Sequence, residues 1–258
     1  VTENITLYAH LVQKVEMKFV DSATGEVVKT ISDGEPGKTR SKPSSRQQPS
    51  KTDYTLYEYY VDAECTQVFG WPYTFGEEDV TVYVKFIPGR WTIVKTAQEF
   101  TSALLSNVNI YVDADIDFNG VDWSMVEKFN ATINGNGHTI SNISINHTFN
   151  KNNLAYCALF GSLGEKANVY DLTFSNVSIT AEVTLSGEYK LAMFACGAVE
   201  GAQVSNVSVS GTINCKYRNY LEPSYSNWII GNNAQATAPA PADIESTVTI
   251  VMTGADNA

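Results

Sequence analysis

This sequence of 258 residues lacks long apolar runs and is poor in basic residues, and each absence excludes a class of protein. No segment approaches the roughly 20 apolar residues that a membrane-spanning helix requires. The 17 basic residues are outnumbered by 28 acidic residues, so the formal net charge is −11. Because nucleic-acid binding needs clustered Lys and Arg, we expect no nucleic-acid partner.

Cysteine is also scarce, with four residues at widely separated positions: Cys65, Cys157, Cys196 and Cys215. None of them forms a Cys-x-x-Cys pair or another spacing typical of a metal site. Phosphate-binding loops, dinucleotide fingerprints and Ser-His-Asp sets are absent as well. We therefore expect no metal, no cofactor and mostly buried thiols that act as small apolar side chains. Export to an oxidising medium would allow one disulfide instead.

Asparagine, in contrast, is abundant and unevenly distributed. All but one of the 21 Asn residues lie beyond residue 100, whereas ten of the 17 basic residues precede Trp91. The change follows Ile87-Pro88-Gly89-Arg90, and Pro and Gly commonly mark the ends of structural elements. We therefore predict one domain at residues 13–89 and a second at residues 90–258.

A repeat within the first region links its two ends. Residues 3–11 line up with residues 78–86, and both segments alternate apolar and polar residues. Each is typical of a terminal strand. Residues 1–12 are therefore interpreted as the terminal strand of a preceding repeat. The sequence is then a piece of a longer protein, whose signal peptide and anchor are expected outside it.

Between these ends, two segments carry a family resemblance. Tyr54 to Thr66 and Val80 to Phe86 resemble the Listeria–Bacteroides repeat family, over roughly residues 13 to 87. The chain departs from the family at Glu58-Tyr59-Tyr60, where members have Gly-Trp-Tyr, and the loop from Gly34 to Lys51 is long and basic. The resemblance implies a small β-grasp-like module that serves as a spacer or an adhesive rather than as an enzyme.

The second region opens with a predicted helix and continues with predicted strands. Thr96 and Glu99 form a capping box at the start of an apolar helical stripe in residues 96–105. Residues 108–118 alternate as in a strand. Three later segments are nearly identical, namely residues 141–145, 175–179 and 205–209. Repetition at about this period is typical of a solenoid.

Glycine corners and apolar strands flank these segments. Residues 129–145 and 159–179 resemble most closely the right-handed parallel β-helices with GLUG-type repeats found in bacterial surface proteins. The resemblance extends over roughly residues 92 to 215 and weakly to about residue 250. It implies a solenoid whose open apolar end is covered by the helix. The predicted fold class is mainly β: a small β-grasp-like repeat module, then a right-handed parallel β-helix with a short N-terminal capping helix.

Matching the glycine corners predicts how the strands stack. Residues 204–209 are expected to pair with residues 169–174, and these with residues 140–145. The residues that then share one column are Asn142, Asp171 and Asn206. The resulting spacings, 29 and then 35 residues, are uneven. Uneven spacing predicts loops between the turns, and such loops are candidate ligand sites.

Four acidic residues are candidates for catalysis: Asp113, Asp115, Asp117 and Asp122. The first three are expected on one strand face at intervals of about 7 Å. Together they suit either Ca²⁺ binding or the acid cluster of a β-helix polysaccharide hydrolase. We favour a solvated outer face instead. The sequence shows no carboxylate at a spacing that would indicate a catalytic partner for His138, so a turn-flanking role is expected for it.

Aromatic residues supply the candidates for ligand binding. One set could form a sugar-stacking or protein-binding surface, but we expect alternate members of it in the core of the first region: Tyr54, Tyr57, Tyr59, Tyr60, Trp71 and Tyr73. A weakly patterned later stretch contains the predicted ligand-binding residues, which are Tyr217, Tyr220, Tyr225 and Trp228. Six Asn-x-Ser/Thr sequons occur, and we attribute them to the composition of solenoid corners rather than to glycosylation.

Together these features predict a non-enzymatic module on a bacterial cell surface, adhesin-like or a stalk. We expect an extracellular monomer that binds a glycan or a host or matrix protein along the solenoid face. Aromatic stacking and hydrogen bonds from Asn, Ser and Thr would provide the contacts. The alternative is a polysaccharide-active hydrolase or lyase that uses the four aspartates.

Overall fold

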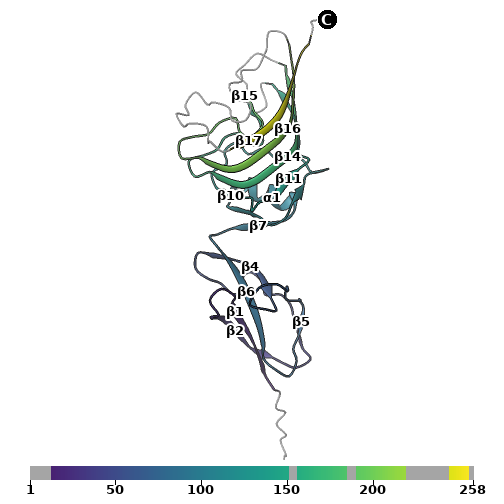
Figure 1. Ribbon diagram of the computed structural model, residues 1–258. Coiled ribbons are helices and arrows are strands. Elements are labelled where there is room, and N and C mark those ends of the chain that lie inside the picture. The colour runs from purple at the N-terminus through teal and green to yellow at the C-terminus, as the bar shows by residue number, and fades with distance from the viewer. Residues whose placement is uncertain (1–12, 151–155, 185–189, 219–243, 256–258) are drawn as a thin grey trace, which may run out of the picture. The chain divides into compact units, whose positions relative to one another are not determined.

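The computed structural model describes residues 13–150, 156–184, 190–218 and 244–255. This part of the chain is mainly β-structure with one helix, which confirms the predicted fold class at that level. The chain divides into two compact units between Arg90 and Trp91 (Figure 1). Among the described residues, no helix is both long enough and apolar enough to span a membrane.

The first unit is built on a four-stranded mixed sheet. Its strands are β1 (Val15–Asp21), β2 (Val27–Gly34), β4 (Tyr54–Tyr60) and β6 (Val80–Pro88). They lie in the order β2-β1-β6-β4. Strand β1 is parallel to β6, and the other two pairs are antiparallel. Two short strands, β3 (Thr39–Arg40) and β5 (Tyr73–Thr74), form a separate antiparallel pair.

Alternating apolar residues fill the core of the first unit. In β1, Met17 and Phe19 are buried while Lys18 between them is half-buried, as expected for a strand with one face on the core. The buried ring of Tyr59 packs against Phe19 at 5.8 Å and Trp71 at 5.5 Å between centroids. The expectation that alternate aromatic residues form the core is confirmed for Tyr59 and Trp71, while Tyr54 is exposed.

The second unit is built on a stack of parallel strands. In spatial order these are β7 (Thr92–Val94), β8 (Ile110–Val112), β10 (Thr132–Asn134), β14 (Asn168–Val183), β16 (Gln203–Arg218) and β17 (Ile244–Ala255). Each neighbouring pair in this stack is parallel.

Shorter strands extend the same parallel arrangement. They are β9 (Ile116–Asp117), β11 (Thr139–Ser141), β12 (Ser144–Phe149), β13 (Tyr156–Cys157) and β15 (Lys190–Leu191). Strand β11 pairs with β9 and with β14, and β12 pairs with another part of β14. Strands β13 and β15 pair with each other.

A further set of parallel bridges repeats at a nearly constant spacing. Phe160 bridges Val126 and Ala195, which lie 34 residues before and 35 residues after it. Leu163 bridges its own two partners at the same spacings. Successive stretches of chain therefore lie side by side in register. Their buried side chains form one continuous apolar core.

The helix α1 (Ala97–Leu105) begins where the sequence predicts. The Thr96 hydroxyl accepts a hydrogen bond from the Glu99 backbone N–H, and the Glu99 carboxylate accepts one from the Thr96 N–H. The predicted capping box is therefore confirmed. Phe100 is buried, and its ring lies 6.2 Å from that of Phe118. The apolar side of the helix thus covers the core beside β7 and β8.

The predicted strand at residues 108–118 is wrong in one respect. Residues 113–115 separate β8 from β9, so the segment is two short strands. Strand β8 pairs with β10 and β9 pairs with β11, and residues 135–138 turn between those two partners. The break in the first strand therefore lies opposite a turn in its neighbour.

The predicted register is correct for one pair of segments and wrong for the other. Residues 204–209 pair with residues 169–174 as predicted. Residues 140–145, however, pair with residues 174–179. The spacings between turns are therefore 34 and 35 residues rather than 29 and 35. Alternation alone could not decide this, because the same alternating pattern occurs twice along β14.

Candidate functional site

Polar side chains form a ladder at one corner of the second unit. The Asn142 Nδ2 group donates to Asp117 Oδ1 at 2.8 Å, and Asn176 Nδ2 donates to Asn142 Oδ1 at 2.6 Å. The φ angles of Asn142 and Asn176 are 60° and 52°, a left-handed conformation in which Asn is enriched. The corner therefore uses asparagine both for its backbone conformation and for hydrogen bonds between turns.

A second ladder is formed by the later turns. The Asn206 Nδ2 group donates to Asp171 Oδ1 at 2.7 Å, and both residues again have positive φ, 49° and 53°. The predicted single column of Asn142, Asp171 and Asn206 is therefore wrong. Asn142 belongs to the first ladder and the other two residues to the second, because the true register shifts the first segment along β14.

Two substitutions of Asn142 separate the contributions of the first ladder. Asn142→Gly keeps positive φ accessible but removes both ladder bonds, and we expect it to lower the free energy of unfolding by about 1–2 kcal/mol. Asn142→Ala also introduces left-handed strain and should cost about 1 kcal/mol more. Urea unfolding followed by circular dichroism measures both values. A glycine variant as stable as the wild type would show that the ladder bonds contribute nothing net.

The four candidate catalytic aspartates lie in different surroundings. Asp113 forms an ion pair with Lys95 at 2.9 Å, and its side chain is only 5% exposed. The prediction of one shared solvated face is therefore wrong for Asp113, which follows the end of β8. Asp115 and Asp122 are exposed. Within the described ranges, no group of three or more His, Cys, Asp and Glu residues is arranged to hold a metal ion.

Asp115 and Asp117 accept hydrogen bonds from the adjacent turn of chain. The Thr139 backbone N–H donates to Asp115 Oδ1 at 2.9 Å, and this contact lowers the pKa of Asp115 below its ordinary value. The side-chain hydrogen bond from Asn142 lowers the pKa of Asp117 in the same way. Both carboxylates are thereby favoured in their ionised, accepting form.

His138 has a carboxylate neighbour that the sequence does not indicate. Its Nδ1 atom lies 3.2 Å from Asp115 Oδ1. The expected turn-flanking position is confirmed, because His138 directly follows the turn at residues 136 and 137. The two residues are 23 positions apart, a separation that fits no local motif. They meet because β9 and β11 are neighbours in the sheet, which only the strand register reveals.

Most of the predicted ligand-binding aromatics lie outside the described residues. This applies to Tyr220, Tyr225 and Trp228. Tyr217 is described, near the end of β16, where it is half-buried and packs against the apolar core. Its ring therefore contributes to packing.

A pocket of about 300 Å³ lies beside the second ladder. The polar residues that line it come from alternate positions of β14 and β16: Asp171, Thr173, Asn206 and Ser208. Thr173 and Ser208 are direct register partners. Because the residues between these positions are buried, only the polar side chains face outward. The pocket therefore offers a carboxylate, an amide and two hydroxyl groups within a small area.

The four cysteines are free thiols, and most of them are buried as predicted. Cys157, Cys196 and Cys215 are buried, whereas Cys65 is partly exposed. Burial raises the pKa of Cys157 and of Cys196 to about 12 and that of Cys215 to about 11. These three thiols are therefore poor nucleophiles in the folded protein.

A thiol reagent should distinguish Cys65 from the other cysteines. Titration of the folded protein with Ellman's reagent at pH 8 is expected to release about one equivalent quickly, because only Cys65 is accessible. All four thiols should react after denaturation. Cys65→Ser should abolish the fast phase. Fast reaction of the folded Cys65→Ser variant would contradict the burial of the remaining thiols.

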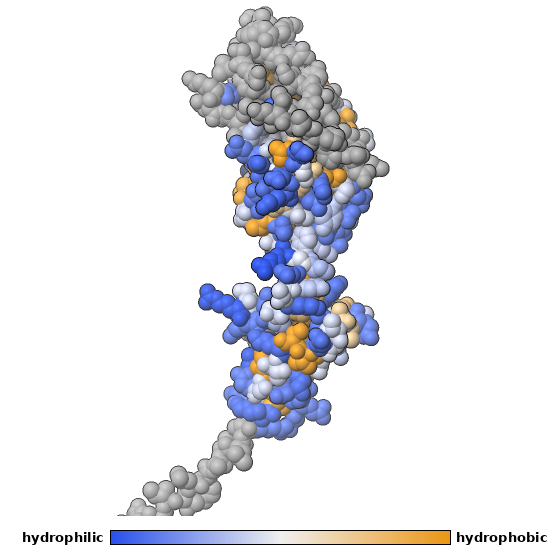
Figure 2. All heavy atoms as spheres, turned by 90° about the vertical axis from the view of Figure 1, so that its left-hand side faces the viewer, coloured by the Kyte–Doolittle hydropathy of each residue, from blue (hydrophilic) through white to orange (hydrophobic). Residues whose placement is uncertain are grey.

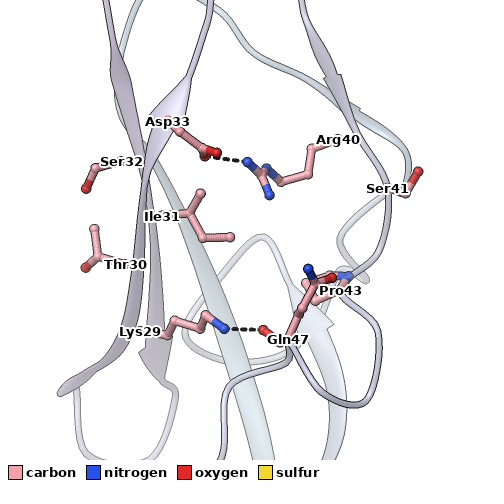
Figure 3. Close-up of a pocket in the computed structure, with 9 residues that line it drawn as sticks. All are labelled: Lys29, Thr30, Ile31, Ser32, Asp33, Arg40, Ser41, Pro43 and Gln47. Carbon is pink, nitrogen blue, oxygen red and sulfur yellow. Dashed lines mark hydrogen bonds and ion pairs between the residues drawn. The ribbon is translucent and has the colours of Figure 1, made fainter.

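A second pocket, of about 340 Å³, lies in the first unit between β2 and the loop after β3 (Figure 3). Two contacts bridge it: Lys29 Nζ donates to the backbone carbonyl of Gln47, and Asp33 forms an ion pair with Arg40. Ile31 points into the space between the two bridges. The only sequence signal for this pocket is the length and basic character of the loop.

Part of this chain is similar to a much longer known protein. Halomucin from Haloquadratum walsbyi is 36% identical over 88 residues, which cover 34% of this chain and 1% of that protein. No family model matches the chain. No solved structure matches it either. The chain thus corresponds to a very small share of the relative's length, and the similarity concerns about a third of the chain.

Proposed function

We propose that this chain is a non-enzymatic, extracellular cell-surface module that acts as an adhesin-like or stalk element. Residues 90–258 would form a right-handed parallel β-helix capped by α1, and residues 13–89 a β-grasp-like repeat module. Parallel pairings at spacings of 34 and 35 residues support the first assignment. The strand order β2-β1-β6-β4, with β1 parallel to β6, supports the second.

The main support for a non-enzymatic role comes from the contacts and pKa values of the candidate carboxylates. A glycoside hydrolase needs two carboxyl groups, one of which has a raised pKa and stays protonated. Hydrogen bonds from the neighbouring turn lower the pKa of Asp115 and of Asp117 instead. Asp113 is enclosed and paired with Lys95. These aspartates are better suited to joining adjacent turns than to acid catalysis.

The pocket beside the second ladder is the best candidate for contact with a glycan. Its carboxylate, amide and hydroxyl groups complement the hydroxyl groups of a sugar. Figure 2 shows a face that is mostly hydrophilic, with apolar patches of limited size. Such a surface favours polar recognition over a large hydrophobic interface. The protein would bind as a monomer, along the side of the stacked strands.

Glycan-array and matrix-protein binding by the purified chain tests this proposal. Combining Thr173→Val with Ser208→Ala removes two hydroxyl groups from the pocket and should weaken glycan binding about tenfold. Ser144→Ala removes an exposed hydroxyl elsewhere, on β12, and serves as the matched control. Tyr220→Ala and Trp228→Ala test the predicted aromatic contacts in the same assay. If the chain bound no glycan and no matrix protein, only the stalk role would remain.

The same material tests the alternative of a polysaccharide-active enzyme. We expect no new reducing ends and no unsaturated products from a panel of acidic and neutral polysaccharides. Turnover that is abolished by Asp115→Ala or Asp122→Ala, and retained by Ser144→Ala, would overturn the non-enzymatic proposal.

A further inference from the structure

The lining of the bridged pocket in the first unit has a net positive charge, although the chain as a whole is acidic. Five of the six charged residues from Glu35 to Lys51 are basic, although the whole chain has a net charge of −11. Arg40 of β3 and Lys29 of β2 both line the pocket, and Asp33 of β2 is the one acidic residue among the lining residues. Lys29 contacts a backbone carbonyl, so no acidic side chain neutralises it in this bridge. The pocket therefore favours an anion.

The Arg40 guanidinium is only partly satisfied by the protein. Asp33 accepts from its terminal NH2 group, while the Arg40 Nε group is buried without a hydrogen-bond partner. Guanidinium groups bind carboxylates best through two parallel hydrogen bonds. The Asp33 side chain is 73% exposed, and exposed pairs of this kind contribute little stability. Asp33 can therefore yield its place to another carboxylate at small cost.

The walls between the two cations suit a sugar ring. In Figure 3, Ile31 points across the pocket toward the loop that carries Pro43 and Gln47. Thr30 and Ser32 point to the other side of β2. The apolar side chains can support the C–H groups of one ring face. A volume of about 340 Å³ lies near the lower limit for small-molecule sites, which fits one or two rings.

We propose that this pocket binds the carboxylate of an acidic sugar, such as a hexuronate residue. Arg40 and Lys29 pair with the carboxylate, and Ile31 and Pro43 support the ring. Asp33 holds the site in the empty state, as an internal carboxylate that the ligand displaces. The site is separate from the pocket on the second unit, and it holds whether or not that pocket binds a glycan.

Calorimetric titration of the whole chain with methyl glucuronide and with methyl glucoside tests the proposal. We expect the charged sugar to bind at least about tenfold more tightly than the neutral one. Asp33→Asn removes the competing carboxylate and should tighten binding about threefold or more. Glu35→Gln makes the same charge change two residues away, where Glu35 pairs with Lys14, and should change affinity less than about twofold.

Substitution of the two basic residues, Arg40 and Lys29, should weaken glucuronide binding. Arg40→Gln and Lys29→Gln should each weaken glucuronide binding about tenfold. Arg46→Gln, an exposed position in the same loop, should leave it nearly unchanged. Thermal unfolding checks that each variant is folded. If Arg40→Gln does not fold, the affinity of Lys29→Gln for glucuronide decides the test.

The inference would be overturned by no binding of glucuronide, by equal binding of glucoside, by an equal loss in Arg46→Gln, or by weaker binding by Asp33→Asn. Inorganic sulfate and poly-glutamate identify the other sources of an anion. Binding of either one as tightly as glucuronide would assign the pocket to a simple anion or to an acidic peptide, and not to a sugar.

Discussion

Replacement of Gly135 by alanine is expected to destabilise the second unit by about 3 kcal/mol or more. A Cβ atom at this position would lie 2.2 Å from the Asp171 carbonyl oxygen and 2.5 Å from the Leu172 Cβ. Asp171 is tied to the next turn through its hydrogen bond with Asn206. The backbone that would have to move is therefore part of the stack. Urea unfolding followed by circular dichroism measures the loss.

The same turn contains a matched control. Gly137 has φ +77°, and a Cβ placed there would meet nothing within 4 Å. Asparagine tolerates this backbone conformation, so Gly137→Asn should cost no more than about 1 kcal/mol. If Gly135→Ala proved as stable as Gly137→Asn, close approach between the turns would not be what requires glycine at position 135.

Local chemistry made parts of the second unit predictable. The capping box of Thr96 and Glu99 specifies its own hydrogen bonds within four residues, so the helix and its start could be inferred without a partner. The pairing of residues 204–209 with 169–174 was also predictable, because glycine corners flank both segments. Such signals depend only on neighbours in sequence.

The pairing of residues 140–145 with residues 174–179 could not be inferred, because it depends on the lengths of the turns that precede the paired strands. Asn134 pairs with Tyr170, and Thr139 pairs with Thr173. Four residues separate the first members of these two pairs, whereas only two residues separate their partners. The Asn-Gly-Asn-Gly run supplies the extra pair. An alternating pattern that occurs twice along β14 then fits two registers equally well, and only core packing selects one.

The candidate sites were harder still to predict from the sequence. The contact of His138 with Asp115 depends on the register, and the bridged pocket depends on an ion pair between Asp33 and Arg40 across a loop. Neither contact has a spacing that marks it in the sequence. The basic composition of the loop was visible, but the side of β2 that it covers was not. Lys29 could therefore not be assigned to a site.

Phe160→Ala is expected to lower the stability of the second unit by about 3–5 kcal/mol. Phe160 is completely buried, and its ring lies 5.2 Å from Phe194, 5.7 Å from Phe129 and 6.3 Å from Phe174. Phe129, Phe160 and Phe194 come from successive turns of chain, and Phe174 comes from the same turn as Phe160. Truncation therefore leaves a cavity in the middle of the stack, and neighbours held by parallel pairing on both sides cannot collapse into it.

The conservative variant Phe160→Leu separates the effect of the cavity from that of aromatic contact. It keeps much of the side-chain volume and should cost about 1–2 kcal/mol. The core of the first unit is a separate cluster built around Phe19 and Tyr59, so its own unfolding should not change in either variant. A urea titration that follows amide exchange in both units tests this. A loss below 1 kcal/mol for Phe160→Ala would mean that the stack tolerates a void, and simultaneous destabilisation of the first unit would mean that the two cores unfold as one.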